Sequence, residues 1–493
     1  MTRTLFPHQT TAVQWMMERE KDTEAPGGFL CDEMGLGKTI TSIGLLTKSR
    51  VAYTLILGPL AVIQQWVQAV REEGPAVFTI EKQCWICKGG NILKGRVYIT
   101  NYDKLVSQPS LFNRLWNRIL CDEAHTLRNC KGKRFKELKK LKTEHMWLLT
   151  GTPIVNSKKE FGSLLSLIKP SIGADYSPSL QEAKEGMSKY ALCRTTEQLR
   201  TVLPGIFPSK PTIVEHRLPF TTEEEAIFYQ TIQGKTKKQL EALLESKDPD
   251  MIIMLQLLLR LRQISVHPQI YINSRRKRQP EYEQKDWNGH STKLEGILNI
   301  LRNDTVSHGY VIFCHFQEEM TLLKSYLEKE SCVGSVETYT GGLSIQQRND
   351  VIEATTLNVR RADQVAAELR ATFPTSLPLP GTLCSIIANF LPAKHTVLLA
   401  QIQTAGTGLN LQHMSRVIFT TPWWTAALMD QAIGRILRMG QTEQVVIHHV
   451  ALEEECNEDE ENPIINIDDY INERVTMKRT LCKELLDAAN HTV

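Results

Sequence analysis

The sequence predicts an α/β protein with two parallel sheets and a helical region between them. Short, continuous apolar runs, each followed by a polar or glycine-containing turn, recur in two groups, before about residue 155 and after about residue 309. Runs of this kind are typical of parallel strands that are covered on both faces. Amphipathic stretches such as Ile40–Thr47 and Gln317–Glu328 lie between the runs, and this alternation predicts an α/β architecture.

The expected strands divide between the two groups. They are Thr54–Pro59, Arg96–Asn101, Arg118–Asp122 and Met146–Gly151 in the first group, and Tyr310–Phe316, Thr396–Gln401, Arg416–Pro422 and Val445–Leu452 in the second. Between the groups, Thr221–Arg262 is rich in Glu, Gln, Lys and Leu at helical spacing. This composition predicts a helical insertion that links two lobes.

Three segments are expected to be irregular. Thr372–Gly381 carries three Pro residues, and Glu453–Glu461 carries seven acidic residues in nine, which favours a loop and a solvated excursion respectively. Ser274–Gly289 is polar and is expected to be an exposed loop. Its basic run, Arg275–Arg278, is either solvated or a patch for phosphate contact or nuclear import, and the sequence leaves these alternatives open.

Composition restricts the classes of function. The 493 residues include 58 Lys and Arg against 55 Asp and Glu, so the formal net charge is +3. This near-balance excludes binding to nucleic acid by bulk charge alone. No run of about 18 apolar residues is present, so we expect no membrane span. Eleven scattered Cys favour an intracellular protein with reduced thiols, and the lone pair Cys84 and Cys87 lacks the further ligands that zinc needs.

The segment Asp32–Thr39 reads DEMGLGKT and lies between an apolar run and an amphipathic stretch. Strand, glycine turn and helix in this order are typical of a phosphate-binding P-loop. Gly35 and Gly37 allow backbone N–H groups to approach phosphate oxygens, Lys38 supplies a charge, and Thr39 can ligate Mg²⁺. The helix N-terminus favours the same anion. The general P-loop pattern has Gly at the position of Asp32.

A second chemical motif is DEAH, Asp122–His125, which directly follows the expected strand RILC. A strand that ends in Asp-Glu can place Asp122 near Mg²⁺ and Glu123 near the water that attacks the γ-phosphate. Two adjacent acids on a surface would be commonplace by themselves. Together with the P-loop upstream, they predict a nucleotide-hydrolysing site.

A third motif is QAIGRILRMGQ, Gln431–Gln441. Gln431, Arg435 and Arg438 lie at i, i+4 and i+7, so we expect them to share one face of a helix. Two Arg in an otherwise apolar stretch suit the stabilisation of charge that develops on a γ-phosphate.

The motifs, taken in order, resemble those of the Swi/Snf-type helicase-like ATPases, within the second superfamily of helicases. In the first half the matching segments are LFPHQTTAVQWM (Leu5–Met16), DEMGLGKT, LILGPLAVIQQW (Leu55–Trp66), ITNYDKL (Ile99–Leu105), DEAH, LLTGTPIVNS (Leu148–Ser157), LCRTTEQL (Leu192–Leu199) and LRLRQISVHP (Leu259–Pro268). DEMGLGKT is nearly the family's own version of the P-loop, which accounts for Asp32.

The second half continues the resemblance. The matching segments are KLEGILNIL (Lys293–Leu301), VIFCHFQEEM (Val311–Met320), TYTGGLSIQQR (Thr338–Arg348), QTAGTGLNLQ (Gln403–Gln412), TPWW (Thr421–Trp424) and QAIGRILRMGQ. DEAHTLRN, LRLRQISVHP and TTPWW favour the subgroup of Rad-five/Rad-sixteen-like and transcription-termination translocases. The sequence departs from the family between Arg348 and Thr396, where the usual passage to the next strand is short, and the role of residues 349–395 is not indicated.

The resemblance implies ATP, with Mg²⁺, in a cleft between two RecA-like lobes. The implied ATP-binding residues are Gln9 as the adenine reader, Asp32, Glu33, Met34, Gly35, Leu36, Gly37, Lys38 and Thr39. The implied catalytic residues are Lys38, Asp122, Glu123, Arg435 and Arg438, with Thr39 and Asp122 at the metal. The implied coupling residues are His125, Thr150, Gly151, Thr152 and Gln431. The candidate DNA contacts are Gly58, Pro59, Thr340, Gly341, Gly342, Gln403, Thr404 and Thr407.

The same resemblance suggests four regions. They are an ATP-binding lobe (1–205), a helical inter-lobe region with the basic loop (206–290), a C-terminal lobe (291–455), and the acidic loop with a C-terminal brace helix (456–493). We expect the brace helix, Asp468–Ala488, to run back towards the first lobe.

The function that follows is a DNA-dependent ATPase that translocates on duplex DNA and remodels or displaces bound proteins, such as nucleosomes or transcription complexes. Two alternatives stay open: a strand-separating helicase, which shares every motif, and an ATP-binding scaffold with little turnover. A scaffold would not need Glu123 together with Arg435 and Arg438. We expect an intracellular protein, in a nucleus or a viral DNA compartment, with no membrane partner.

Overall fold

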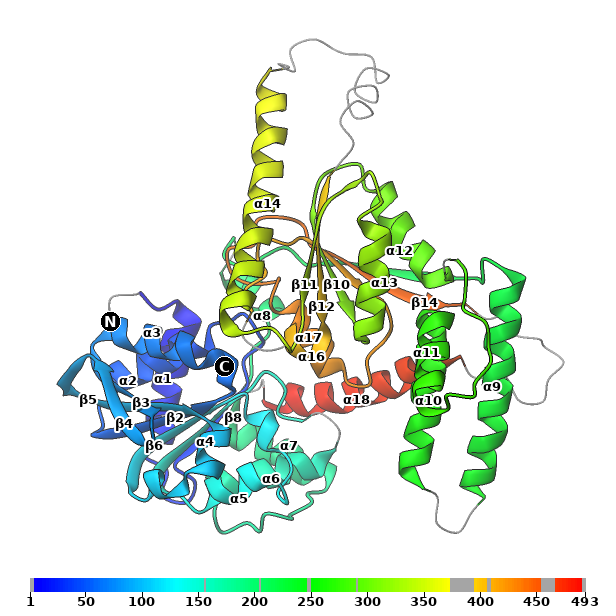
Figure 1. Ribbon diagram of the computed structural model, residues 1–493. Helices are drawn as coiled ribbons and strands as arrows, with labels where there is room; N and C mark the ends of the chain where they lie inside the picture. Colours follow the sequence, from blue (N-terminus) through cyan, green and yellow to red (C-terminus); the bar gives the residue numbers. More distant parts are fainter. Residues whose placement is uncertain are drawn as a thin grey trace.

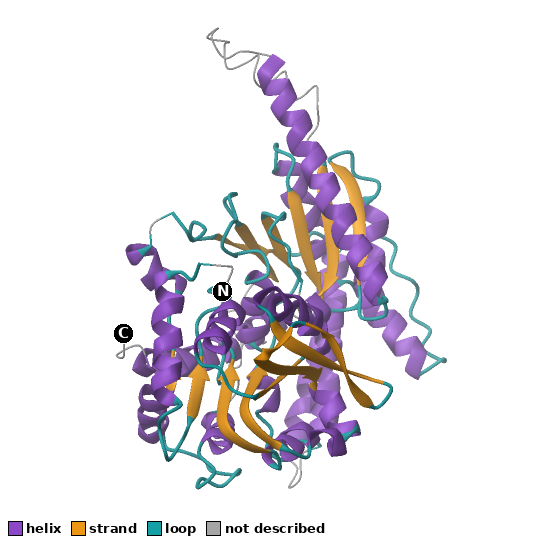
Figure 2. Cartoon of the chain, turned by 90° about the vertical axis from the view of Figure 1, so that its left-hand side faces the viewer, coloured by secondary structure: helices purple, strands orange, loops and turns teal. Residues whose placement is uncertain are grey.

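Two sheets, each with helices on both faces, organise the chain (Figure 1). The computed structural model describes residues 4–154, 157–203, 205–245, 250–289, 291–372, 394–405, 409–453 and 466–489. Figure 2 shows the two groups of strands from a second direction. The predicted α/β architecture with two parallel-sheet lobes is confirmed.

The sheet of lobe one has eight strands in the order β4-β3-β5-β2-β6-β7-β1-β8. Its strands are β1 (Gly27–Leu30), β2 (Tyr53–Gly58), β3 (Pro75–Glu81), β4 (Cys84–Gly89), β5 (Asn91–Asn101), β6 (Leu115–Asp122), β7 (Lys142–Leu149) and β8 (Ala191–Leu192). Every neighbouring pair is parallel except β3 and β4, which are antiparallel. The parallel pairing brings the carboxyl ends of β1, β2 and β6 to one edge of the sheet, where the P-loop and DEAH begin.

The sheet of lobe two has six strands in the order β11-β12-β10-β13-β14-β9, and all of its pairs are parallel. Its strands are β9 (Thr212–Leu218), β10 (Gly309–Cys314), β11 (Val333–Tyr339), β12 (His395–Gln401), β13 (Arg416–Phe419) and β14 (Val446–Leu452). The strand β9 belongs to the region 206–290 that the sequence predicts to be helical. Its register with β14, Thr212 opposite Val446, makes it an edge strand of lobe two.

Helices cover both faces of both sheets. In lobe one they are α1 (Pro7–Arg19), α2 (Lys38–Lys48), α3 (Ile63–Glu73), α4 (Tyr102–Ser107), α5 (Lys133–Lys139), α6 (Lys158–Ile168), α7 (Leu180–Tyr190) and α8 (Thr196–Val202), with the 3-10 turns η1 (Leu60–Val62), η2 (Pro109–Phe112) and η3 (Ala124–Leu127). In lobe two they are α12 (Thr292–Asn303), α13 (Gln317–Leu327), α14 (Ile345–Thr372), α16 (Ile402–Ala405) and α17 (Ala426–Ile433). Each face of each sheet buries its own apolar cluster, which explains the unalternated apolar runs.

A helical arm lies beside lobe two and consists of α9 (Glu223–Leu244), α10 (Met251–Val266) and α11 (Pro268–Arg278). Local caps begin these helices: the Asp250 carboxylate accepts from the N–H groups of Ile252 and Ile253, and Pro268 occupies the first turn of α11. The basic run Arg275–Arg278 forms the last turn of α11, so the expectation of a loop from Ser274 is wrong there. Cations at a helix C-terminus are favoured by its negative end.

The helix α14 projects from lobe two at the top of Figure 1 and occupies the start of the unusual segment 349–395. The prediction of a proline-rich loop over Thr372–Gly381 falls outside the described residues after Thr372. The acidic stretch Glu453–Glu461 falls outside them after Glu453.

The last helix, α18 (Ile467–Ala489), connects the two lobes. Its first turns bury Ile467 and Ile471 against Leu261 of α10 and Ala426 of α17, whereas Leu485 near its end belongs to the apolar core of lobe one. The Lys184 ammonium of α7 lies 3.3 Å from the Glu484 carboxylate. Of the helices that the structure describes, none combines the length and apolar character of a membrane span.

Candidate functional site

The P-loop joins β1 to α2. Gly35 and Gly37 have φ of +91° and +83°, in the left-handed region that favours glycine, and Gly37 caps α2. Lys38 is the first residue of α2, and its ammonium donates to the backbone oxygen of Asp32 at 2.6 Å. Thr39 follows in the same turn. The loop therefore presents backbone N–H groups, the positive end of a helix and one ammonium on the same side.

Gln9 of α1 lies against this loop. Its Nε2 donates to the backbone oxygen of Leu36 at 3.3 Å, and its Oε1 accepts from the N–H of Phe6 at 3.1 Å. A Cβ at Gly37 would lie 2.5 Å from the same Nε2, and the φ of +83° favours glycine at this position. The predicted adenine reader therefore lies next to the phosphate-binding turn, and its role stays a prediction.

The acidic start of DEMGLGKT holds the loop in place. The Asp32 carboxylate accepts two hydrogen bonds from Arg194, at 3.0 Å and 2.5 Å, and both residues are buried. The Glu33 carboxylate accepts from the N–H of Thr196 at 2.5 Å. The side chains of Asp32 and Glu33 thus fasten the loop to the segment after β8. Their predicted contribution to nucleotide binding is therefore through the shape of the loop.

Asp122 ends β6, which β7 separates from the P-loop strand β1. Its Oδ2 accepts from Trp66 Nε1 at 2.7 Å and its Oδ1 from the N–H of Glu123 at 2.9 Å. The Tyr102 hydroxyl donates to the Asp122 backbone oxygen at 2.7 Å. Burial, and then the adjacent Glu123, raise the pKa of Asp122 to about 6. Trp66 and Tyr102 lie in the family-like motifs LILGPLAVIQQW and ITNYDKL, but the motif pattern alone does not indicate that they hold Asp122.

Glu123 stands between the two lobes. Its backbone has φ of +48°, which is uncommon for a residue with a side chain. Its Oε1 lies 3.6 Å from Arg435 Nη2 of lobe two, and its Oε2 lies 3.4 Å from His125 Nδ1 of lobe one. The carboxylate predicted to act on the attacking water therefore faces a predicted γ-phosphate arginine.

His125 makes a second contact across the lobes. The Gln431 amide Nε2 lies 3.3 Å from His125 Nε2 and donates to it, which places the ring proton on Nδ1, where Thr150 Oγ1 lies at 3.3 Å. Burial, and then Arg128, lower the pKa of His125 to about 4, so the ring is neutral at pH 7. Thr150 Oγ1 in turn accepts from the N–H of Thr152 at 3.1 Å. The predicted coupling residues thus form one chain from Gln431 to the segment after β7.

The arginine segment differs from the sequence prediction. The helix α17 ends at Ile433, so Gln431, Arg435 and Arg438 do not share one continuous helix. Gly434 follows the helix, and glycine is a poor helix former. Tight turns replace it, with the N–H of Ile436 donating to the backbone oxygen of Ile433 at 2.9 Å. These turns nevertheless bring Arg435 to Glu123.

Arg438 lies on the same side of the cleft. Its Nε donates to the Gly434 backbone oxygen at 3.1 Å, and burial, followed by Arg435, lowers its pKa to about 10, so it remains charged at pH 7. A Cβ at Gly35 would lie 3.1 Å from the Leu437 backbone oxygen, which shows how closely the P-loop approaches this segment. Both predicted arginines therefore lie next to the predicted nucleotide site.

Comparison with known proteins identifies the family. The model of the SNF2-related domain matches residues 8–270, which is more than half of the chain, and the model of the helicase conserved C-terminal domain matches residues 383–440. The chain belongs to the SNF2-related family. It is thus a helicase-like ATPase, a hydrolase that acts on ATP, and the resemblance found in its motifs is confirmed.

Curated SNF2-related relatives are distant in sequence. The chain is 23% identical over 517 residues to the probable global transactivator of Orgyia pseudotsugata multicapsid polyhedrosis virus, over 98% of this chain and 91% of that protein. It is 22% identical over 560 residues to the DNA repair protein RAD5 of Yarrowia lipolytica, over 88% of this chain. The chain spans only 54% of that protein's length. CHD3-type proteins also match, so the predicted subgroup stays a prediction.

One solved structure similar to this chain is the Sulfolobus solfataricus SWI2/SNF2 ATPase core in complex with dsDNA. The identity is 21%, the match covers 99% of this chain and 94% of that one, and the TM-score is 0.39.

The donors of this SNF2-related site fit a magnesium ion. Mg²⁺ in nucleotide sites takes one or two protein oxygens and completes its shell with water and phosphate oxygens. In the part of the chain that the structure describes, no group of three or more His, Cys, Asp or Glu gathers as a closed metal site. Asp122 has a raised pKa, as expected for a half-buried carboxylate beside Glu123, and a bound cation would favour its charged form. Asp122 and the Thr39 hydroxyl would hold the ion.

The candidate DNA contacts fall into two groups. In lobe two, a Cβ at Gly341 would lie 3.2 Å from Thr404 Cγ2, so the segments after β11 and β12 are adjacent, and Arg348 Nη2 donates to the Gly341 backbone oxygen at 2.9 Å. In lobe one, Gly58 ends β2 and Pro59 precedes η1. Thr407 lies outside the described residues.

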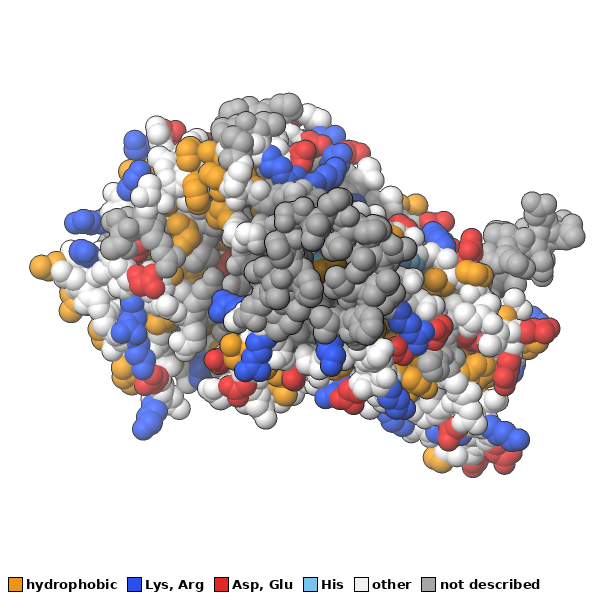
Figure 3. Space-filling model, turned by 90° about the horizontal axis from the view of Figure 1, so that it is seen from above, with side chains coloured by type: hydrophobic (Ala, Val, Ile, Leu, Met, Phe, Trp, Pro, Cys, Tyr) orange, Lys and Arg blue, Asp and Glu red, His pale blue; other side chains and the backbone are white. Residues whose placement is uncertain are grey.

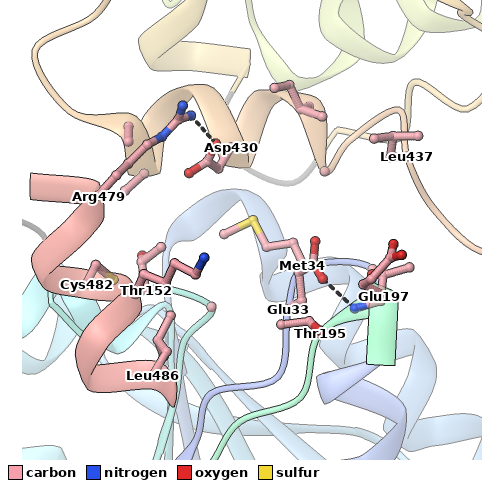
Figure 4. A pocket seen from close by; sticks show the side chains of 18 of the residues that line it. Glu33, Met34, Thr152, Thr195, Glu197, Asp430, Leu437, Arg479, Cys482 and Leu486 are labelled. Carbon is pink, nitrogen blue, oxygen red and sulfur yellow. Dashed lines mark hydrogen bonds and ion pairs between the residues drawn. The ribbon is translucent and has the colours of Figure 1, made fainter. Parts of the chain in front are cut away.

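An inter-lobe cleft of about 750 Å³ adjoins the P-loop. Figure 4 shows Met34 pointing across it towards α17, with Arg479 and Cys482 of α18 on one wall. Its lining includes Glu33, Met34, Gly35 and Leu36 of the P-loop but not Lys38, Glu123 or Arg435, so it borders the predicted nucleotide site without containing these charged residues. It is lined by lobe one, α17 and α18.

Proposed function

We propose that this SNF2-related chain is a DNA-dependent ATPase that translocates on duplex DNA and remodels or displaces proteins bound to it. One observation carries the proposal: residues to which we assign roles in hydrolysis and coupling come from both lobes and meet at Glu123–Arg435 and His125–Gln431. A site divided in this way is complete only when the lobes approach, so nucleotide binding and release would be linked to relative motion of the lobes.

The chemical roles follow from the geometry. Lys38 and the N-terminus of α2 would bind the phosphates, and Glu123 would orient the attacking water. Arg435, which is buried, and Arg438, which is half-buried, would act on the charge that develops in the transition state. Bound Mg²⁺ would neutralise charge on the phosphate oxygens. The neutral His125 would transmit the position of Gln431 to Thr150 without adding a charge to the site.

Duplex DNA is the proposed track. Relatives named for DNA repair, chromatin remodelling and viral transactivation support this, and they also support action in a nucleus or a viral DNA compartment. Figure 3 shows Lys and Arg interspersed with Asp and Glu on one face of the molecule, consistent with the net charge of +3. We propose that backbone contacts from the loops around Gly58 and Gly341 hold the track. Such contacts position a motor without reading sequence.

The test is a side-by-side measurement of ATP hydrolysis. We expect duplex DNA or nucleosomes to raise the rate above that with no nucleic acid, single-stranded DNA or RNA. Stimulation by RNA alone would overturn the proposal. A strand-separation assay and a triplex-displacement assay then divide the alternatives: release of a complementary strand supports a helicase, whereas triplex displacement without it supports duplex translocation. Absence of turnover under every condition would favour an ATP-binding scaffold.

A further inference from the structure

Several segments that resemble family motifs, but have no role in the nucleotide site, converge on one buried ionic cluster. The cluster consists of Arg262 of α10, Lys293 of α12, Glu319 of α13 and Asp468 of α18. Each of these charged side chains is at most 2% exposed. Burying four charges is costly unless each is compensated by a partner, so their contacts indicate what the cluster holds.

Arg262 grips the segment that precedes α17. Its Nη2 donates to Thr421 Oγ1 at 2.9 Å and to the Pro422 backbone oxygen at 2.6 Å, and its Nη1 lies 3.3 Å from His315 Nε2. Its guanidinium carbon lies 4.8 Å from the centre of the Trp423 ring. One planar fork thus engages three consecutive residues, a geometry that a lysine ammonium cannot reproduce.

The other members tie this grip to three further helices. Lys293 Nζ lies 2.6 Å from Asp468 Oδ2, which joins α12 to the start of α18. Glu319 Oε2 accepts from the N–H groups of His315 and Phe316 at 2.8 Å and 3.0 Å, and Thr420 Oγ1 donates to its Oε1. Burial lowers the pKa of Arg262 to about 10, with Asp468 and Glu319 opposing that shift. The guanidinium therefore remains charged.

The gripped segment leads directly into the catalytic one. Thr421–Trp424 precedes α17, α17 carries Gln431, and Arg435 and Arg438 follow it. The helix α18 holds the same short element from another side, because Lys478 donates to the Trp424 backbone oxygen at 3.2 Å and Arg479 lies 2.7 Å from the Asp430 carboxylate. The placement of α17 therefore depends on α10 and α18, which contribute no group to the nucleotide.

We propose that Arg262 is a positioning residue for ATP hydrolysis, which fixes the start of α17 so that Arg435 and Arg438 reach the γ-phosphate. The buried ionic cluster transmits the positions of the helical arm and of α18 to these arginines. This inference rests on the proposed roles of Arg435 and Arg438. It assigns a function to LRLRQISVHP and TPWW, which contact each other through the Arg262 side chain and through the apolar cluster that holds Leu261 and Trp424.

The first test compares Arg262→Met and Arg262→Lys with the unaltered chain. We expect kcat with duplex DNA to fall about tenfold or more in Arg262→Met while the KM for ATP and the affinity for nucleotide change less than about twofold. Arg262→Lys keeps the charge but loses the fork, so we expect an intermediate kcat. Arg302→Met is the matched control, because Arg302 pairs with Glu330 and Glu295 on the surface of lobe two. We expect its kcat to be unchanged.

A double-mutant cycle with Arg438→Ala distinguishes a positioning role of Arg262 from a purely structural one. If Arg262 acts through the arginine segment, Arg262→Met lowers kcat less in the Arg438→Ala background than in the unaltered chain. The inference would be overturned if the fold decreases in kcat of the two single variants multiplied fully in the double variant. It would also be overturned if a rise in the KM for ATP accounted for the lost activity of Arg262→Met. If Arg438→Ala alone leaves kcat unchanged, the proposed function of Arg438 fails instead.

Thr421→Val keeps the proposal testable if Arg262→Met does not fold. This variant removes the hydroxyl that accepts from Arg262 and preserves the shape of the side chain. We expect a smaller fall in kcat, again with little change in KM. An unaltered kcat in a folded Thr421→Val, together with an unaltered kcat in Arg262→Lys, would contradict the proposal.

Discussion

At the scale of single residues, Asp32, which follows β1, and Asp122, which ends β6, acquire different roles from their partners. Asp32 receives two hydrogen bonds from the buried Arg194 and fastens the P-loop. Asp122 receives only neutral donors, Trp66 and the Glu123 N–H, and lies next to a second carboxylate. The first carboxylate is therefore already neutralised by a protein cation, whereas the second is suited to a metal ion.

Removal of the charge from Lys38 or Glu123 tests the site directly. We expect Lys38→Ala or Glu123→Gln to abolish DNA-stimulated ATP hydrolysis, because the first loses the phosphate-binding charge and the second loses the carboxylate that faces Arg435. Circular dichroism and thermal unfolding should show an intact fold. Turnover close to that of the unaltered chain in either variant would refute the assignment.

The buried ion pair Asp32–Arg194 is expected to contribute to the free energy of unfolding. Arg194→Met leaves the Asp32 carboxylate buried without its cation, so we expect the free energy of unfolding to fall by about 3–5 kcal/mol. The control is Arg134→Met, whose pair with Asp103 is exposed, and we expect a loss of at most about 1 kcal/mol. Chemical denaturation of the three proteins measures both values. Equal losses would show that burial of the Asp32 pair has no energetic consequence.

At the scale of elements, sequence reasoning succeeded where a local pattern determines the structure. The apolar run before DEAH forms β6, and the strand, glycine turn and helix around Lys38 are present. It failed where a tertiary contact or a single residue decides. The spacing of Gln431, Arg435 and Arg438 fits a helix, yet α17 ends before Gly434. Thr212–Leu218 becomes a strand because β14 offers it an edge, which no local pattern reveals.

The candidate site shows the same division. The motifs predicted the charged residues that meet between the lobes, because phosphate chemistry restricts the residue types. They did not predict that Trp66 and Arg194 hold the two aspartates, since these contacts span 56 and 162 positions in the sequence. Long-range hydrogen bonds of this kind have no periodic signature.

A histidine pair on β9 and β14 leads us to expect that the free energy of unfolding depends on pH. His448 Nδ1 lies 2.9 Å from His216 Nε2, and burial, followed by His216, lowers the pKa of His448 from 6.5 to about 4. The folded chain therefore favours neutral His448. Its contribution to stability is complete above about pH 6.5 and is lost as the pH falls from 6.5 towards 4.

Replacement of this histidine should reduce that dependence. His448→Asn cannot acquire a proton in this range, so we expect its free energy of unfolding to change less between pH 7 and pH 5 than that of the unaltered chain. Denaturant titrations at both values measure the difference. Identical pH dependence in the two proteins would show that His448 is not a contributor.

At the scale of the whole molecule, α18 and the helical arm contact α17 and so link parts of the chain outside the nucleotide site to the arginine segment. The helix α18 packs on lobe two through Ile471 and on lobe one through Leu485, and it holds α17 through Arg479. A rotation of the lobes must therefore rearrange α18 together with the arginine segment. The helix α18 thus links the two lobes that the sequence predicts.

The basic end of α11 tests how this nearly neutral molecule holds DNA. Two of its four cations have acidic partners, since Arg276 lies 2.5 Å from Asp286 and Lys277 lies 2.5 Å from Glu318. The pKa of Arg260 is lowered chiefly by burial, and the charges of Arg275 and Arg278 lower it further. A cluster of like charges is stabilised when phosphates approach. We therefore expect Arg275→Gln with Arg278→Gln to weaken DNA affinity.

The same variant should flatten the dependence of binding on salt. Each lost phosphate contact lowers the slope of log affinity against log salt by about 0.9 for duplex DNA. Binding titrations between about 50 and 200 mM salt measure this slope. The control Arg276→Gln with Lys277→Gln removes equal charge from cations that already have partners, so its slope should change less. A slope unchanged in both variants would assign the basic run to solvent or to targeting, and would leave DNA binding to the loops of the two lobes.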